Sequence, residues 1–361
     1  MQVREAIAQD AGTLAILFSV SNQDAAVGHT AGRYTLTLAP MNPPTSSPFG
    51  ERRYRAWNEH VKTRYGGRVQ KVSVLAGFTC PNRDGSLGKG GCTFCNNASF
   101  TPGYLDQRQT ITQQLDAGLD FLRRRYPGTQ RYMAYFQSYS NTYGELERLR
   151  ACYAEALAHP DVSGLAIGTR PDCLPDAVLD YLAELASNHI IELEIGVESC
   201  NDAALARVNR GHTFATSVDA IERAAARGLE VTAHLMLGLP GESVDSMLDG
   251  ARLLSKLPIH ALKLHQLQIV RGTLLARDWQ RDPDTVPLLG EEACINLLAD
   301  VIERLSPRIL LQRVGSEVPP SQKLAPEWNV RLSELAPRIS AELARRGSWQ
   351  GYHYVQDVSK Q

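Results

Sequence analysis

Three cysteines, Cys80, Cys92 and Cys95, lie close together in the chain with the spacing Cys-x11-Cys-x2-Cys. A cubane iron–sulfur cluster has four irons and takes four ligands, so three local thiolates would leave one iron open to bind and activate another molecule. A structural zinc site would need a fourth protein ligand, and no histidine lies between His60 and His159. The spacing therefore favours a cluster with one open iron.

The segment between the first two cysteines is rich in glycine. Gly85, Gly88, Gly90 and Gly91 allow a tight backbone path and leave room for N–H groups to approach cluster sulfides. Pro81 fixes the direction of the chain after the first cysteine. This composition is typical of a loop that wraps an inorganic group.

The elements that would position these cysteines alternate between strand and helix. Strands are predicted at 72–76, 132–136, 165–168, 190–197, 231–237 and 261–269. Amphipathic helices are predicted between them at 110–125, 143–158, 176–187, 216–227 and 243–257. This order predicts an α/β fold with a parallel sheet and right-handed crossovers, here a partial (βα)6 TIM-like barrel. The cysteines follow the first strand, at the end where such folds carry function.

The remaining segments suggest a simple domain organisation. Residues 1–50 are rich in Ala, Thr, Ser, Asn and Pro, which predicts a poorly ordered N-terminal extension. The barrel core is expected to span 51–270. A helix at 291–306, a strand at 309–314 and a helix at 332–346 predict a small C-terminal α/β module over 271–350, followed by a tail at 351–361.

Composition bounds the class of protein. The 361 residues are 43% hydrophobic and 21% charged, as expected of a globular protein with a sizeable core. The net charge of −1 excludes a global basic field, so any nucleic-acid surface would be a local patch. No apolar run is long enough to span a membrane. The other cysteines share no spacing, which indicates buried thiols in a reducing, cytoplasmic setting; they are Cys152, Cys173, Cys200 and Cys294.

A basic segment precedes the first predicted strand. Its cations face only Glu59 as a nearby acid; they are Arg52, Arg53, Arg55, Lys62, Arg64, Arg68 and Lys71. The segment is either a solvated surface element or a phosphate-binding patch.

Five short sequence motifs along the chain carry a specific family resemblance. They are Gly77-Phe-Thr-Cys-Pro-Asn-Arg-Asp-Gly, Gly168-Thr-Arg-Pro-Asp-Cys, Asn209-Arg-Gly-His-Thr, Gly238-Leu-Pro-Gly-Glu and Lys263-Leu-His-Gln-Leu-Gln-Ile-Val. With the cysteine loop, they resemble radical S-adenosylmethionine (SAM) enzymes. The long first gap departs from the common Cys-x3-Cys-x2-Cys and is similar to the subgroup of the elongator catalytic subunit. The match is best to the bacterial YhcC/YtqA family and covers about residues 54–350.

The resemblance implies two cofactors and a reaction class. A [4Fe-4S] cluster on Cys80, Cys92 and Cys95 would chelate SAM through its open iron. Reductive cleavage of SAM would give a 5′-deoxyadenosyl radical that abstracts hydrogen from a substrate. An electron donor such as flavodoxin or ferredoxin would be needed as a partner.

The resemblance also assigns SAM contacts to strand ends. Phe94 would pack near the adenine, although a plain core aromatic would look the same. Gln137 stands where the family contacts the SAM amino group, but the usual Gly-Gly-Glu form is missing. Glu198 and Ser199 would bind the ribose, and Arg210 the carboxylate of SAM by paired hydrogen bonds.

Further polar residues lie within predicted strands. Lys263 and His265 alternate on one strand, so both point to the same face, and they would serve with His234 in the barrel lumen near adenine or substrate. Glu192 and Glu194 also share one face, which is either solvent-exposed or part of a polar lumen.

Three functions fit these observations. The first is a radical SAM enzyme acting on an RNA base, in particular the wobble uridine of tRNA, with phosphate contacts from the basic segment and from Arg123, Arg124, Arg125 and Arg131. The second keeps the chemistry but acts on a small metabolite or a protein. The third is a non-enzymatic, metal-stabilised binding module.

Overall fold

The computed structural model describes residues 7–10, 13–16, 47–316, 318–328 and 330–355. The chain divides into two compact units, Met1–Ser47 and Pro48–Gln361. In the first unit, β1 (Ile7–Asp10) pairs antiparallel with β2 (Thr13–Ile16). Most of the expected N-terminal extension and the end of the expected tail lie outside the described residues, so both stay predictions.

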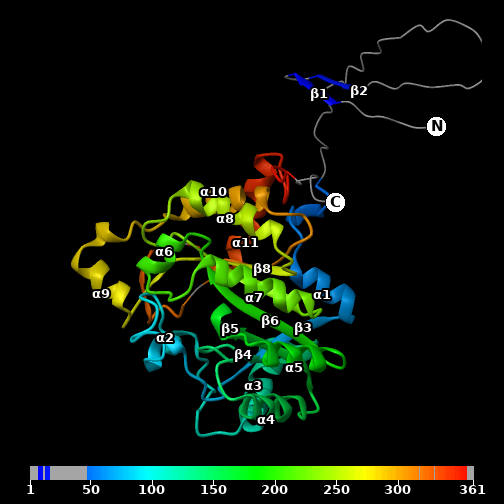
Figure 1. Cartoon of the computed structure of the whole chain (residues 1–361), viewed down its shortest axis with the longest axis vertical. Coiled ribbons are helices and arrows are strands. Elements are labelled where there is room, and N and C mark those ends of the chain that lie inside the picture. Colours follow the sequence, from blue (N-terminus) through cyan, green and yellow to red (C-terminus); the bar gives the residue numbers. More distant parts are fainter. Residues whose placement is uncertain (1–6, 11–12, 17–46, 317, 329, 356–361) are drawn as a thin grey trace, which may run out of the picture. The chain divides into compact units, whose positions relative to one another are not determined.

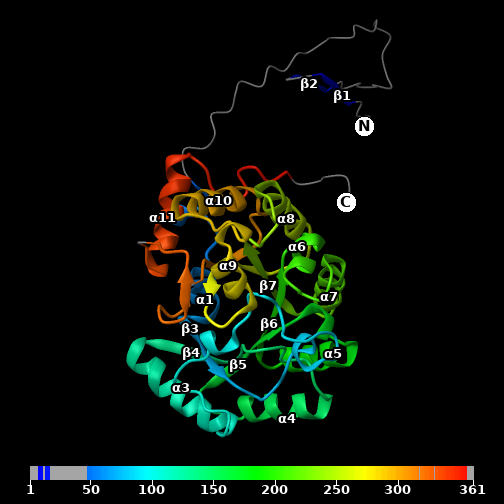
Figure 2. The same ribbon diagram turned by 90° about the vertical axis from the view of Figure 1, so that its left-hand side faces the viewer.

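The second unit is built on one parallel sheet of seven strands in the order β10-β8-β7-β6-β5-β4-β3. The strands are β3 (Arg68–Val74), β4 (Thr129–Phe136), β5 (Val162–Thr169), β6 (Ile190–Glu198), β7 (Glu230–Leu237), β8 (Ala261–Gln266) and β10 (Leu310–Val314). The sheet curls into a half-barrel with helices on its outer side (Figures 1 and 2). The predicted TIM-like fold is confirmed, and all six predicted strands are present.

The helices between the strands also agree with the predictions. They are α3 (Ile111–Arg125), α4 (Leu146–Leu157), α5 (Asp176–Ala186), α7 (Phe214–Ala226) and α8 (Val244–Lys256). Side-chain caps fix several of their starts: Thr110 and Gln113 form a capping box on α3, and the hydroxyl of Ser243 accepts from the N–H of Ser246 on α8.

Alternation along the strands separates an apolar outer face from a polar inner face. In β6, Leu193, Ile195 and Val197 are fully buried, whereas Glu192 and Glu194 have the opposite parity and face the lumen. Burying such an apolar side chain stabilises the fold by about 1.5–3 kcal/mol. The main core therefore lies between the sheet and its helices, and the inside of the curl is free to be polar.

The open side of the half-barrel is closed by elements that the sequence did not indicate. The edge strands β3 and β10 both contact α1 (Trp57–Tyr65), and the N–H of Leu311 donates to the carbonyl of Arg55 at 2.8 Å. Only Val61 of α1 is buried, which explains why its amphipathic pattern is weak.

Other short elements also escaped the sequence pattern because they are too brief to show a period. They are α2 (Pro81–Asp84), α6 (Asp202–Arg207), α9 (Leu274–Arg281) and the antiparallel pair β9 (Ile269–Val270) and β11 (Lys323–Ala325). The seventh strand, β10, comes from the segment expected to form a C-terminal module, but it pairs with β8 in the main sheet.

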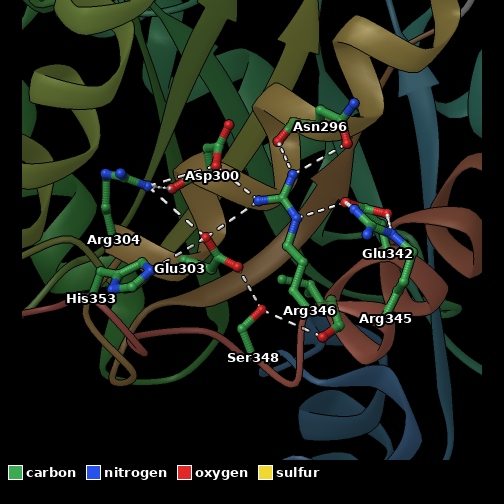
Figure 3. A network of polar contacts seen from close by, with 10 residues as sticks. Asn296, Asp300, Glu303, Arg304, Glu342, Arg345, Arg346, Ser348 and His353 are labelled. Atoms are coloured by element: carbon green, nitrogen blue, oxygen red, sulfur yellow. Dashed lines mark hydrogen bonds and ion pairs between the residues drawn. The ribbon is translucent and has the colours of Figure 1, made fainter.

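An ion-pair network holds the C-terminal helices α10 (Glu291–Arg304) and α11 (Leu332–Arg345) together (Figure 3). Arg346, just after α11, lies 2.8 Å from Asp300 and 3.4 Å from Glu303 on α10, and 2.6 Å from Glu342. Glu303 is buried and also accepts a hydrogen bond from Ser348. These helices pack beside α8, so the network supports the β10 side of the barrel.

We expect Arg346→Ala to lower the free energy of unfolding by roughly 2–3 kcal/mol, because it leaves the buried carboxylate of Glu303 without its guanidinium partner. Urea titration followed by circular dichroism measures this. Arg345→Ala is the matched control, since that side chain is 71% exposed and pairs only with Glu342. Equal losses in the two variants would contradict this role of the network.

Candidate functional site

A cavity of about 250 Å³ lies at the carboxyl ends of the strands and extends into the lumen. Its walls include every predicted site residue except Ser199. The lining residues from that set are Cys80, Cys92, Cys95, Phe94, Gln137, Glu198, Arg210, His234, Lys263 and His265. Residues far apart in the sequence thus meet at one place, as expected for strand ends of a parallel sheet.

The cysteine loop follows β3 and is fixed by neighbouring side chains. The amide nitrogen of Asn82 lies 3.8 Å from the sulfur of Cys92, and Arg83 donates to the carbonyl of Cys95 at 2.8 Å. Gly91 has φ +82°, and a Cβ there would come within 2.7 Å of the Arg83 side chain, so this position requires glycine.

The three thiols all face the cavity. Within the described part of the chain, no three His, Cys, Asp or Glu side chains gather around a single point as ligands of one ion. Burial raises the pKa of the Cys95 thiol. Three cysteines on one wall are a donor set suited to a cluster, in which each thiolate binds a separate iron.

Arg210 forms a buried cationic corner beside the cysteines. Its guanidinium donates to the carbonyl of Gly196 at 2.6 Å, and lies 3.6 Å from the sulfur of Cys92 and 3.7 Å from the carboxylate of Glu198. Burial opposes its charge, but Cys92 and Glu198 raise the pKa of Arg210 above the usual range. A Cβ on Gly196 would approach Arg210 to 2.6 Å, so only glycine allows this arrangement.

The turn at the end of β6 places Glu198 and Ser199 in different surroundings. Glu198 has φ +66°, a left-handed conformation that a residue with a Cβ adopts only under strain. The turn leaves Glu198 on the cavity wall and directs Ser199 away, where its hydroxyl donates to Glu242 at 2.6 Å. The expected ribose contact of Ser199 has no counterpart in the cavity.

Glu194 is the centre of the lumen. One oxygen pairs with Lys71 at 2.6 Å; the other pairs with Lys263 at 2.6 Å and accepts from Tyr135 at 2.7 Å and from His234 at 2.9 Å. The four partners come from β3, β4, β7 and β8, and Glu194 on β6 is completely buried among them. Of the two readings of Glu192 and Glu194, the polar lumen is the one found.

The two lysines of this network, Lys71 and Lys263, have pKa shifts in opposite directions. Burial opposes the charge of both. Lys71 has Glu192 and Glu194 as partners, and they raise the pKa of Lys71 above its usual value. Lys263 pairs with Glu194 alone and feels the charge of Lys71, so burial dominates and lowers the pKa of Lys263 to about 8. Burial and Lys263 lower the pKa of His234, which favours its neutral form.

Phe94 has both the cavity and an apolar cluster as neighbours, and its contact with adenine stays a prediction. It lines the cavity, and it also packs against an apolar cluster that includes Val208, Leu239 and Leu267. Gln137 lies on the wall just after β4.

Several cavity residues were not foreseen. They are Phe100, Tyr135, Tyr139, Gln268, Arg313 and Ser316. Tyr135 lies inside β4, so a lumen-facing parity could have suggested it once the strands were assigned to one sheet. Arg313 lies in β10, where a register shift interrupts simple alternation. Phe100, Tyr139 and Ser316 lie outside the predicted strands and helices, where no periodic signal exists, and Gln268 falls at the end of the strand predicted at 261–269.

The four scattered cysteines lie outside the cavity. Cys173 and Cys294 are buried, and burial raises the pKa of each thiol to about 12. The hydrogen-bond partner of Cys200 is the carbonyl of Gly250 at 3.7 Å. These environments are those of structural thiols.

The basic residues considered for phosphate contacts have other positions and partners. Arg55 donates to the carbonyl of Arg308, and Lys71 belongs to the Glu194 network. Arg123 at the end of α3 and Arg131 near the start of β4 lie at the amino end of the strands, whereas the cysteines follow the carboxyl end of β3. The cations therefore do not surround the cavity mouth.

Comparison with known proteins decides the family. The model of the radical SAM superfamily matches residues 80–254, and that of the radical SAM C-terminal domain matches 259–345. YtqA of Bacillus subtilis is 34% identical over 83% of this chain and 92% of its own length. The chain belongs to the radical SAM superfamily. Within it, the chain is a member of the YhcC/YtqA family, since YhcC of Escherichia coli is 38% identical over 73% of this chain and 84% of its own.

More distant relatives of this radical SAM protein extend the comparison. A tRNA uridine(34) acetyltransferase of Dehalococcoides mccartyi is 30% identical over 43% of this chain and 34% of its own length. The solved structure of Methanocaldococcus infernus Elp3 superimposes with a TM-score of 0.58 at 18% identity, covering 78% of this chain and 64% of that one, and shows the shared fold.

Family membership makes the protein an enzyme that uses a [4Fe-4S] cluster and SAM. The cavity fits this pair: Cys80, Cys92 and Cys95 line it together, and Arg210, which packs against Gly196, offers a cation for a carboxylate. No helix in the described ranges is long and apolar enough to cross a membrane.

We expect Glu194→Gln to lower the free energy of unfolding by about 3–5 kcal/mol, because the buried Lys263 loses its counter-charge and Lys71 loses one of its two. Chemical denaturation measures the loss. Glu147→Gln is the control, since the carboxylate of Glu147 is 89% exposed and lies 3.9 Å from Arg150. A stability change in Glu194→Gln as small as that in the control would show that the lumen does not depend on this charge.

Proposed function

We propose that this enzyme abstracts a hydrogen atom from a base of tRNA, in particular the wobble uridine, inside the cavity. When bound, the reduced cluster and SAM supply a 5′-deoxyadenosyl radical, which becomes 5′-deoxyadenosine on taking the hydrogen. The observation that carries the proposal is that the three cysteines and the motif-bearing strand ends line one cavity.

The chain's own residues have distinct roles in this proposal. Cys80, Cys92 and Cys95 hold the cluster. Arg210 presents the positive charge that attracts the SAM carboxylate, beside the carbonyl of Gly196 and the carboxylate of Glu198 that it already contacts. The carboxylate of Glu198, held at the cavity wall, accepts hydrogen bonds from ribose hydroxyls.

The lumen and the wall near β4 complete the binding of SAM. Gln137 contacts the amino group, and Phe94 excludes water beside the adenine. His234, Lys263 and His265 line the side of the lumen where adenine and substrate meet, and the ion pairs of Glu194 keep these groups fixed.

Two features support an RNA base as the substrate. Phe100 and Tyr139 line the cavity although they are 42% and 37% exposed, so both rings are open to a stacking partner. Bases removed from a stack are held by aromatic rings and by hydrogen bonds to their edges. In addition, one relative is named a tRNA uridine(34) acetyltransferase. A small metabolite or a protein is the alternative substrate, and it would not need the exposed rings.

The test is 5′-deoxyadenosine production by the reconstituted enzyme with SAM and a strong reductant, with and without bulk bacterial tRNA. We expect tRNA to raise production, and Cys80→Ala, Cys92→Ala and Cys95→Ala to abolish it, because each removes a cluster ligand. Cys152→Ala is the matched control, since Cys152 lies outside the cavity on α4.

The outcomes separate the parts of the proposal. Production that depends on the three cysteines but ignores tRNA would leave the chemistry intact and contradict the RNA substrate. Undiminished production in the three cysteine variants would contradict the assigned cluster ligands. Equal loss in Cys152→Ala would show that the variants report folding.

We also propose where an electron donor docks. A groove of about 500 Å³, here called the outer groove, reaches Cys92 and Cys95 from outside the lumen. Arg83, Arg271 and Arg277 line it, and no acidic side chain of the described residues does. A cationic groove at the thiolates suits a small acidic electron carrier such as flavodoxin or ferredoxin, since charge complementarity speeds association.

We expect the double substitution Arg271→Glu and Arg277→Glu to slow reduction by flavodoxin roughly tenfold at low salt, because it reverses the charge of the outer groove. Stopped-flow spectroscopy of the cluster measures the rate. Reduction by dithionite is the internal control, and Lys62→Glu with Arg124→Glu is the matched change elsewhere on the surface. Equal slowing in both double variants would contradict docking at this groove.

A further inference from the structure

Arg313 points into the cavity because the edge strand β10 is irregular. The register of β10 against β8 shifts between Leu311 and Arg313, and Arg313 lies opposite Lys263. Without the shift, alternation would place Gln312 inside and Arg313 outside. With it, Gln312 still reaches Glu192 at 2.7 Å, and Arg313 lines the cavity as well. Bulges next to active sites re-aim side chains in this way.

The side chain of Arg313 has no hydrogen bond or ion pair with any residue that the structure describes. The other cations on the cavity wall are each engaged: Arg83 with the carbonyl of Cys95, Arg170 with Asp172, Arg210 with Glu198 and Lys263 with Glu194. Arg313 is exposed and lines the cavity, so its side chain is open to an entering ligand.

The nearby carboxylates could pair with Arg313 only by losing partners that they already have. Both oxygens of Glu194 are occupied, as described above. Glu192 pairs with Lys71 at 2.8 Å and accepts from Thr232 at 2.9 Å and from Gln312 at 2.7 Å. Arg313 and Lys263 are thus neighbouring cations on paired strands, and Arg313 has no counter-charge among the described residues. An incoming anion would stabilise this arrangement.

A second, independent feature lies beside them. The Nε2 atom of His265 is buried and has no hydrogen-bond partner among the described residues. His265 follows Lys263 on the same face of β8 and lines the cavity. An unpaired buried ring nitrogen costs free energy unless a ligand pairs with it.

We propose that Arg313, with Lys263 and His265 beside it, forms an anion-binding subsite that receives a carboxylate or phosphate group of the substrate. The guanidinium would bind either group through two parallel hydrogen bonds. The inference rests on the proposed function in taking the anion to be part of the molecule that loses hydrogen. It adds that this molecule carries a negative group that enters the lumen beside β8 and β10.

The test is calorimetric titration of the cluster-loaded enzyme with SAM bound and no reductant, so that no turnover is involved. The probes are malonate and inorganic phosphate at constant ionic strength. We expect saturable binding to the unchanged enzyme and about tenfold weaker binding to Arg313→Gln. Arg313→Lys should bind with intermediate affinity, because it keeps the charge but loses the paired geometry. Tighter binding of malonate would identify a carboxylate, and tighter binding of phosphate a phosphate.

Arg124→Gln is the control, since Arg124 is an exposed residue of α3 with no role in the cavity. Melting temperatures of all variants check folding. The proposal would be overturned by absent binding, by unchanged affinity in Arg313→Gln, or by equal weakening in the control. A loss of SAM affinity in Arg313→Gln would also overturn it, since Arg313 would then serve the cofactor. Because no hydrogen abstraction is measured, failure of the tRNA proposal would not produce any of these results.

Discussion

The buried carboxylate of Glu194 is the interaction on which the inside of this barrel depends. A parallel sheet curled with apolar groups outside leaves an inner face that helices cannot cover, and here that face is charged. Lys71, Tyr135, His234 and Lys263 converge on Glu194 from β3, β4, β7 and β8. A buried charge persists only when it is paired and hydrogen-bonded. The same contacts therefore tie five strands together and keep polar groups fixed beneath the cavity.

The arrangement above this network follows from where the strands end. The cysteine loop leaves β3, Glu198 terminates β6 in a left-handed turn, and Arg210 returns from the segment after α6 to contact Cys92. Gly196 makes the approach of Arg210 possible. In the account proposed here, the cysteines and Arg210 hold the cluster and the SAM carboxylate, and side chains of β8 and β10 face the substrate.

Much of this was predictable from the sequence because strands and helices with long, regular apolar patterns are set by local chemistry. The six strands, the intervening helices and the grouping of the cysteines with Arg210, Lys263 and His265 all belong to this class. The position of Glu194 in the lumen could not be predicted. Strand alternation shows that Glu192 and Glu194 share a face, but it does not show whether that face meets solvent or a lumen. The position of Arg313 in the cavity could not be predicted for a related reason. The register shift in β10 changes which side chains point inward, and no residue type signals such a shift. The position of Ser199 outside the cavity lining was not foreseen either, because the left-handed conformation of Glu198 turns the chain there.

The most direct measurement is the transfer of a hydrogen atom from substrate to 5′-deoxyadenosine. Deuterated tRNA, taken from cells that lack this enzyme and are grown on deuterated medium, would be incubated with the reduced, cluster-loaded enzyme and SAM. The account predicts 5′-deoxyadenosine that carries one deuterium by mass spectrometry. 5′-Deoxyadenosine that forms in the presence of this tRNA but carries no deuterium would contradict hydrogen abstraction from tRNA.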